Sequence, residues 1–110
     1  MADTHSITEP VLLILLSLAE QPRHGYSILK DVAEMSRGRV QMSTGTLYGA
    51  LRRLLEEGWI ARHSAEDKSR GRQDYRLTNR GRKMLQQEVA HLKQLTRIAG
   101  LRVATTEQPT

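Results

Sequence analysis

Residues 43–58, with the sequence STGTLYGALRRLLEEG, hold the pattern from which the architecture of this chain can be worked out. Ser43 is a residue type that caps the start of helices, and Gly58 is typical of the position just after a helix. Between them lie leucines with the spacing of one helical face, Leu47, Leu51, Leu54 and Leu55. The opposite face carries two glycines and an arginine, Gly45, Gly49 and Arg52. We therefore expect a helix over 43–57 that buries its leucines and turns a smooth strip outward.

Two further helices are expected before this segment. Thr8, Glu9 and Pro10 form a helix start that leads into an apolar run, which predicts a first helix ending near Glu20. Its apolar residues surround the whole helix, so it needs cover on more than one side. A second helix is expected from about His24 or Gly25 and should end at Gly38.

The residues after position 58 predict a β-hairpin and a long helix. Two half-apolar runs, 59–64 and 73–77, flank a charged stretch that contains glycine, which is typical of a hairpin. The pair Thr78-Asn79 then starts a last helix. The order of three helices, a hairpin and a long helix predicts a mainly α, α+β fold, a winged helix-turn-helix with a C-terminal extension. The expected division is a winged helix-turn-helix domain over 1–77, a dimerisation helix over 78–103 and a flexible tail over 104–110.

Composition and charge limit the function classes. The chain has 110 residues and a net charge of +5, but residues 37–83 alone carry +7, whereas residues 1–36 carry −3. A localised basic segment suggests an anionic partner such as nucleic acid, with a solvated surface as the alternative. The chain has no cysteine, which excludes disulfides and thiolate metal sites and fits a cytoplasmic protein.

Enzymatic, metal and membrane functions find little support. The four histidines are scattered, no H-E-x-x-H motif is present, and we expect neither a metal nor a cofactor. The apolar run near the N-terminus is too short to span a bilayer, and no Lys or Arg precedes it as in a secretory signal.

The helix over 43–57 is the candidate recognition element, because a helix-turn-helix places its second helix in the major groove. Glycine costs a helix about 1 kcal/mol relative to alanine, so two glycines one turn apart suggest close approach of the backbone to DNA. The candidate contacts beside them are Thr44, Thr46, Tyr48, Arg52 and Arg53. Alternatively, the glycines allow close packing against another helix and Tyr48 belongs half to the core.

The hairpin supplies a second candidate surface, the wing over 62–76. Its basic side chains are Lys68, Arg70, Arg72 and Arg76. A basic ribbon beside a recognition helix is suited to phosphates or to the adjacent minor groove. The alternative is that these residues keep an exposed loop solvated.

The last helix is expected to act as a dimer arm. From Thr78 to Leu101 it would be about 36 Å long, more than a small domain can cover. Its apolar residues recur as in a coiled-coil seam, at Leu85, Val89, Leu92, Leu95 and Ala99. Together with Leu12 and Leu16 of the first helix, they are the candidate dimerisation residues. The alternative is packing onto the chain's own first helix.

Several of these residues, taken in order, resemble the PadR family of transcriptional regulators. The matching motifs are His24-Gly25-Tyr26, Gly45-Thr46-Leu47-Tyr48, Arg53-Leu54, Gly58-Trp59-Ile60, Gly71-Arg72, Tyr75, Leu77-Thr78 and Gly81, spread over roughly residues 10–85. The resemblance implies a homodimeric winged-helix DNA-binding protein, usually a repressor, with the last helix as dimer arm. It also implies DNA contacts by Ser43, Thr44, Thr46 and Tyr48, and by Lys68, Arg70 and Arg72 in the wing.

We therefore expect a homodimeric repressor that binds an inverted-repeat operator in double-stranded DNA. Two alternatives stay open: a winged-helix module that binds proteins without sequence-specific DNA binding, and a sensor with a small-molecule effector site at the dimer interface. Trp59 is expected to fill core space beside the hairpin, with stacking on a ligand as the alternative.

Overall fold

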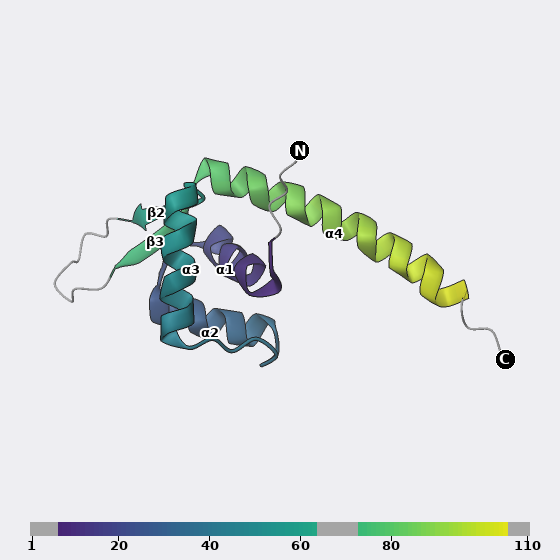
Figure 1. Cartoon of the computed structure of the whole chain (residues 1–110), viewed down its shortest axis with the longest axis horizontal. Coiled ribbons are helices and arrows are strands. Elements are labelled where there is room, and N and C mark those ends of the chain that lie inside the picture. The colour runs from purple at the N-terminus through teal and green to yellow at the C-terminus, as the bar shows by residue number, and fades with distance from the viewer. Residues whose placement is uncertain (1–6, 64–72, 106–110) are drawn as a thin grey trace.

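The computed structural model describes residues 7–63 and 73–105 of the chain. Its elements are α1 (Glu9–Glu20), β1 (Arg23–His24), α2 (Gly25–Met35), α3 (Thr44–Glu57), β2 (Ile60–His63), β3 (Asp74–Leu77) and α4 (Asn79–Thr105) (Figure 1). This order confirms the mainly helical, winged helix-turn-helix fold with a long C-terminal helix. Predictions that concern residues 1–6, 64–72 and 106–110 lie outside the described residues.

The predicted helix boundaries arise from local capping. The Ser43 hydroxyl accepts a hydrogen bond from the Thr46 amide at 3.1 Å and starts α3, and Gly58 ends that helix with a left-handed φ of 78°. The Thr78 hydroxyl accepts from the Gly81 amide at 3.0 Å and donates to the Gly58 carbonyl at 2.7 Å. One side chain thus links the start of α4 to the end of α3.

The three strands form an antiparallel sheet in the order β1-β3-β2. The hairpin of β2 and β3 was predicted, with Ile60 opposite Leu77 and His63 opposite Asp74. The third strand, β1, was not predicted: Arg23 pairs with Tyr75 and His24 with Asp74. Strand β1 has only two residues, which is too few to show the alternation of apolar and polar residues that predicts a strand. It is recognised only by its pairing with β3.

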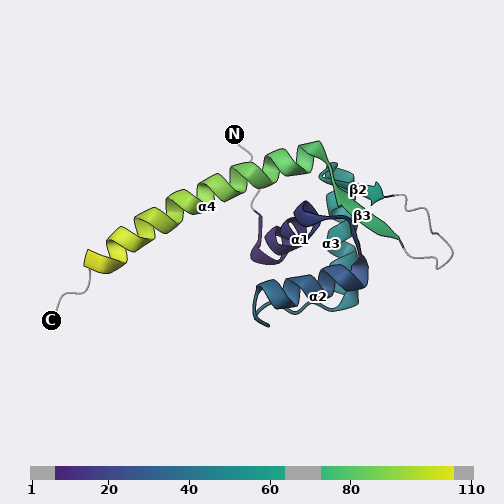
Figure 2. The ribbon, with the colours of Figure 1, turned by 180° about the vertical axis from the view of Figure 1, so that it is seen from behind.

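Helix α1 lies at the centre of the hydrophobic core, between α2, α3 and α4 (Figures 1 and 2). The largest fully buried apolar side chains come from α1, α2, α3 and β2: Ile14, Leu15, Ile28, Val32, Leu47, Leu51 and Ile60. Helix α1 therefore finds much of the cover that its apolar surface requires within one chain.

Helix α4 extends far beyond this core and gives the molecule its elongated shape, 64 × 33 × 22 Å (Figure 2). It begins against α1 and β3, where Leu85 is buried, and its C-terminal half projects away from the domain. It runs to Thr105, two residues past the predicted end at 103. Among the described residues, no helix is both long and apolar enough to cross a membrane.

Candidate nucleic-acid interface

The N-terminal end of α3 presents a set of exposed hydroxyl groups. Ser43, Thr44 and Thr46 are all exposed, and the Ser43 hydroxyl donates to the Thr46 hydroxyl at 3.0 Å while it caps the helix. These interactions orient two of the predicted DNA-contacting side chains before any partner is bound. The same residues therefore define the helix start and an exposed polar tip.

The glycines of α3 face open space. Among the described residues, a Cβ atom added to Gly49 would meet nothing within 4 Å, and one added to Gly45 would meet only the Ser43 hydroxyl, at 3.9 Å. No described helix of this chain packs on either glycine, so close intramolecular packing does not account for them. Together with exposed Arg52 they form an open surface, here called the glycine strip and defined as Gly45, Gly49 and Arg52.

The two arginines of α3 lie on different sides of the helix. Arg52 is exposed next to the glycines, whereas Arg53 is exposed on the flank that faces α1, where it lines a pocket with Val11 and Ala50. Sequence reasoning grouped them as one pair of DNA contacts. Both arginines therefore flank the glycines, and Arg53 lines a hollow together with Gly45 and Gly49.

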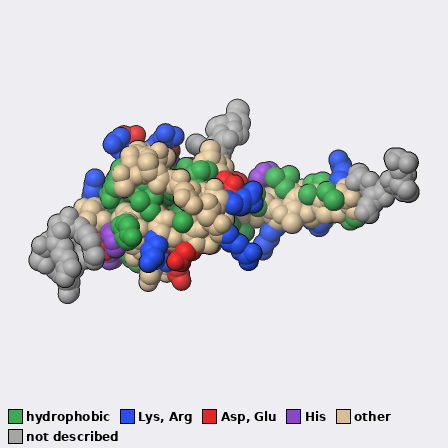
Figure 3. Space-filling model, turned by 90° about the horizontal axis from the view of Figure 1, so that it is seen from below, with side chains coloured by type: hydrophobic (Ala, Val, Ile, Leu, Met, Phe, Trp, Pro, Cys, Tyr) green, Lys and Arg blue, Asp and Glu red, His purple; other side chains and the backbone are tan. Residues whose placement is uncertain are grey.

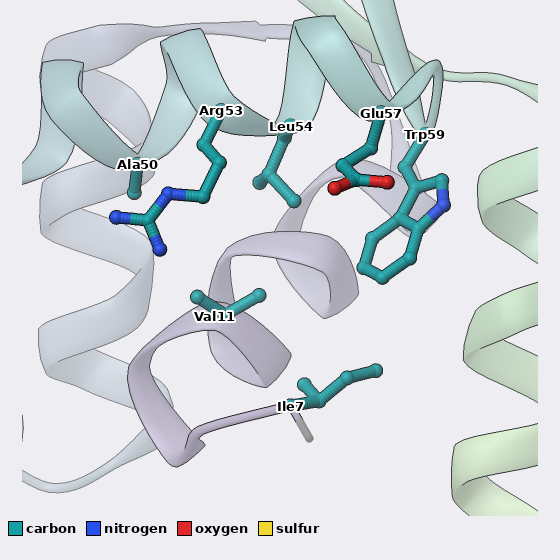
Figure 4. A pocket seen from close by; sticks show the side chains of 7 residues that line it. All are labelled: Ile7, Val11, Ala50, Arg53, Leu54, Glu57 and Trp59. Carbon is teal, nitrogen blue, oxygen red and sulfur yellow. The ribbon is translucent and has the colours of Figure 1, made fainter. Parts of the chain in front are cut away.

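That pocket lies between α1 and α3 and measures about 200 Å³ (Figure 4). The Trp59 indole, the Glu57 carboxylate and the Arg53 guanidinium point into it from above in this view. Ile7 and Val11 form the opposite side. Trp59 is only 6% exposed and belongs to the core, as predicted, but it also forms a wall of this pocket.

A second hollow of about 410 Å³ adjoins the first along the same two helices. Gly45, Thr46 and Gly49 lie on its α3 side, and Thr8 and Pro10 lie on its α1 side. The glycine strip is therefore accessible from the α1 side as well as from the outside.

The wing can be described only at its base. The predicted contacts Lys68, Arg70 and Arg72 lie outside the described residues. On the strands, Arg62 and Arg76 are exposed. The basic character predicted for the wing is thus present where its two strands emerge from the core.

A row of polar residues crosses the sheet beside the wing. His24 pairs with Asp74, and Asp74 pairs with His63, so the three side chains lie next to one another on three strands. Sequence reasoning missed this row because it missed β1. Within the described residues, no group of His, Asp and Glu is arranged to hold a metal ion.

Tyr48 lies on the flank of α3 that faces α2, close to Gly25, and is 44% exposed. The neighbouring Tyr75 on β3 is buried. Burial raises the pKa of the Tyr75 phenol above its ordinary value of 10.0, Tyr48 raises it further, and Arg62 lowers it. Tyr48 and Tyr75 therefore lie close enough to interact where α2, α3 and the sheet meet.

The candidate dimerisation residues fall into two groups. Leu85 is buried in the core of its own chain, and Leu12, Leu16 and Val89 pack against that core while partly exposed. Leu92 is half-buried, whereas Leu95 and Ala99 are exposed. Figure 3 shows hydrophobic side chains at the surface of the projecting arm, next to Lys and Arg side chains. Further exposed hydrophobic residues of this arm are Ile98, Leu101 and Val103.

The sequence of the chain is similar to that of a protein encoded by a bacterial transposon. A protein from transposon Tn4556 of Streptomyces fradiae, described as uncharacterised, is 38% identical over 85 residues. That match covers 77% of this chain but only 23% of the other protein, so the chain spans about a quarter of the length of that relative.

Solved structures show the same fold. A PadR family transcriptional regulator from Eggerthella lenta superposes with a TM-score of 0.71 at 27% identity, covering 89% of this chain and 87% of the other. A PadR family regulator from Clostridium difficile gives 0.73 at 24% identity, covering 87% and 99%. Bacillus subtilis PadR, solved in complex with operator DNA, gives 0.60 at 23% identity, covering 71% and 45%.

The model of the transcriptional regulator PadR-like family matches residues 14–87. This range includes α2, α3 and the sheet, and it ends within the first turns of α4. The match accounts for the motifs noted in the sequence and assigns the chain to regulators and not to enzymes. The chain belongs to the PadR-like family of transcriptional regulators.

Proposed function

We propose that this protein is a sequence-specific repressor that acts in the cytoplasm as a homodimer on an inverted-repeat operator. In the proposed complex, α3 enters the major groove and the wing over 62–76 contacts the DNA backbone or the minor groove. The major groove is about 12 Å wide and admits one α-helix. The dimer would place its two recognition helices about one DNA turn apart, or a multiple of it.

The observation that carries this proposal is the glycine strip. Glycines inside a helix weaken it, and neither glycine is required by packing against residues 7–63 and 73–105 of its own chain. A helix face without side chains lets the backbone approach DNA closely, and Arg52 on the same face can reach a phosphate or a guanine. The similarly folded PadR of Bacillus subtilis was solved with operator DNA, which agrees with this proposal.

The side chains around the glycine strip would contact different parts of the DNA. We assign Ser43, Thr44, Thr46 and Arg52 to the major groove and its adjacent phosphates, since all are exposed at or near the start of α3. Arg53, on the flank toward α1, is assigned to the DNA backbone. The proposed wing contacts are Lys68, Arg70 and Arg72.

Helix α4 supports the proposed homodimer. Its first half packs on its own α1, while its second half carries the exposed seam residues Leu95 and Ala99. Exposed apolar side chains in a row on a projecting helix are stabilised when a second helix covers them. A second copy offers the same stripe, and the partly exposed Leu12 and Leu16 of α1 would border it.

The decisive test of function is selection of bound duplexes from a random pool by the purified full-length protein. We expect enrichment of an inverted repeat, and we expect a reporter gene downstream of that repeat to be repressed when the protein is expressed. Failure to enrich any sequence at physiological salt would contradict the proposal and favour a protein-interaction module. Enrichment with activation of the reporter would contradict only the repressor mode.

A small-molecule effector is the last part of the proposal, and the pocket between α1 and α3 supports it. This pocket lies between α1, which carries the candidate dimerisation residues Leu12 and Leu16, and the recognition helix α3, and it combines an apolar floor with one guanidinium and one carboxylate. At about 200 Å³ it is smaller than most ligand pockets and would hold only a compact molecule with an apolar body and a polar group.

Trp59 makes the effector site directly testable, because it is the chain's one tryptophan. In a screen of small compounds, those that release the protein from its operator should also change Trp59 fluorescence at the same concentrations. Release without any change in fluorescence would place the effector elsewhere, for example at the dimer interface.

A further inference from the structure

Tyr48 occupies the space in which a side chain of residue 25 would otherwise lie. A Cβ atom added to Gly25 would be 2.8 Å from the Tyr48 Cζ atom and closer still to the Tyr48 hydroxyl oxygen. Real Cβ atoms essentially never approach another atom closer than 3.0 Å. As long as Tyr48 keeps this place, residue 25 has to be glycine.

The backbone of Gly25 gives no other reason for glycine. Among the described residues, the glycines with positive φ are Gly38 and Gly58, so Gly25 has a backbone conformation that alanine adopts readily. Gly25 is buried and is the first residue of α2. Residue 25 therefore has to be glycine only because a side chain would have no space, and Tyr48 occupies that space.

The phenol end of Tyr48 thus lies where three elements meet. Gly25 begins α2 directly after β1, and β1 pairs Arg23 with Tyr75 on β3. Tyr48 also lies near enough to Tyr75 to raise the pKa of its phenol. The hydroxyl end of Tyr48 is turned toward the start of α2, whereas the open glycines lie elsewhere on α3.

We propose that Tyr48 is a positioning residue for operator recognition: its ring, seated on Gly25, fixes α3 against α2 and the wing sheet and so sets the pose of the glycine strip. This inference rests on the proposed function, since it concerns how the operator is read. It gives Tyr48 a role different from a hydrogen bond to a base edge. It also assigns a specificity role to Gly25, although Gly25 is buried.

Displacement of Tyr48 should lower the affinity for the operator more than the affinity for a random duplex. Base contacts depend on the position of α3 to within a fraction of an ångström, whereas phosphate contacts by flexible Lys and Arg side chains tolerate small shifts. Overall destabilisation, by contrast, removes folded protein and lowers binding to every duplex alike. The ratio of operator affinity to random-duplex affinity therefore separates positioning from stability.

The test uses four variants of Gly25 and Tyr48 and one control variant, all of the full-length protein, each measured by fluorescence anisotropy on the selected operator and on a random duplex. Tyr48→Phe keeps the ring and removes the hydroxyl, so operator affinity should stay within about twofold of wild type. Gly25→Ala should lower operator affinity about tenfold, the equivalent of one lost base contact, with random-duplex affinity unchanged. Tyr48→Leu should give a loss similar to that of Gly25→Ala.

The double variant Gly25→Ala/Tyr48→Leu provides the internal control, because removal of the ring removes the clash. Its operator affinity should be no lower than that of Tyr48→Leu alone, a non-additive result. Gly100→Ala, at a glycine with nothing within 4 Å, should leave both affinities unchanged.

Four outcomes would overturn the inference. Loss of about tenfold or more in Tyr48→Phe would show that the hydroxyl reads DNA directly. Additive losses in the double variant, or wild-type operator affinity in Gly25→Ala, would show that the contact between the two residues does not matter for reading. If the wild-type protein itself does not distinguish operator from random duplex, the proposed function fails, and the inference fails with it.

Discussion

Gly81 is the residue on which the junction between the sheet and α4 depends most directly. A Cβ atom added there would lie 2.8 Å from the carbonyl carbon of Trp59 and 2.9 Å from the Leu77 Cδ1 atom. The Trp59 carbonyl is held in place by a hydrogen bond from the Thr78 amide at 3.0 Å. The backbone has little freedom to move away, so α4 can start here only through a glycine.

The corresponding prediction compares two glycines of the same helix. Gly81→Ala should lower the free energy of unfolding by about 1–3 kcal/mol, since it forces an extra methyl group into a filled space. Gly100→Ala, in open space, should raise it by up to about 1 kcal/mol through helix propensity. Urea denaturation of both variants checks this, and equal effects of the two substitutions would contradict the assigned packing.

The roles of individual glycines could be predicted from the sequence only in part. Gly58 at a helix end and the outward-facing pair Gly45 and Gly49 follow from local patterns, because capping and helix propensity are local properties. Gly25 and Gly81 instead depend on atoms of Tyr48 and Trp59, which are distant in the sequence. Such steric reasons become visible only when the elements are packed.

At the scale of elements, the boundaries of α1 and α3 were predictable because their caps lie within the segments themselves. Thr8, Ser43 and Gly58 all act as expected. Strand β1 was not predictable, since two residues gain their strand conformation only by pairing with β3, some 50 residues away. With it, the row of His24, Asp74 and His63 was also missed.

The wing is an element whose contribution to binding can be measured by salt dependence. Replacement of Lys68 or Arg70 by alanine should weaken binding to all duplexes and reduce the slope of log affinity against log salt by about one for each lost phosphate contact. Anisotropy titrations over a range of salt concentrations give this slope. An unchanged slope in both variants would show that the wing does not contact phosphates.

At the scale of the whole molecule, the sequence of α4 left two alternatives open: packing onto the chain's own first helix, or packing onto a second copy. The first half of α4 follows the first alternative, and we propose that its second half follows the second. The seam repeats through the entire helix, but Leu85 is buried by its own chain, whereas Leu95 is 47% exposed. A heptad pattern predicts which residues lie on the same face of a helix. It does not predict whether the same chain or a second copy covers that face. The division between intramolecular and proposed intermolecular packing therefore required the structure.

This division yields a prediction about assembly. Leu95→Lys should weaken the homodimer at least about tenfold, because a charged group replaces an apolar one at the proposed interface, while the fold of each chain is retained. Gln94→Lys, at the exposed neighbouring position, should leave the dimer intact. Analytical ultracentrifugation and circular dichroism check both points, and a wild-type dimer in Leu95→Lys would exclude this seam.

The measurement that tests the central claim most directly is the operator affinity of Gly49→Ala. The added methyl group meets no atom within 4 Å in the part of the chain that the structure describes, so the unfolding free energy should stay the same or rise by up to about 1 kcal/mol. If α3 lies against DNA through the glycine strip, operator affinity should fall about tenfold or more, while random-duplex affinity changes by less than about twofold. Unchanged operator affinity in a stable Gly49→Ala dimer would contradict the proposal that this face of α3 enters the major groove.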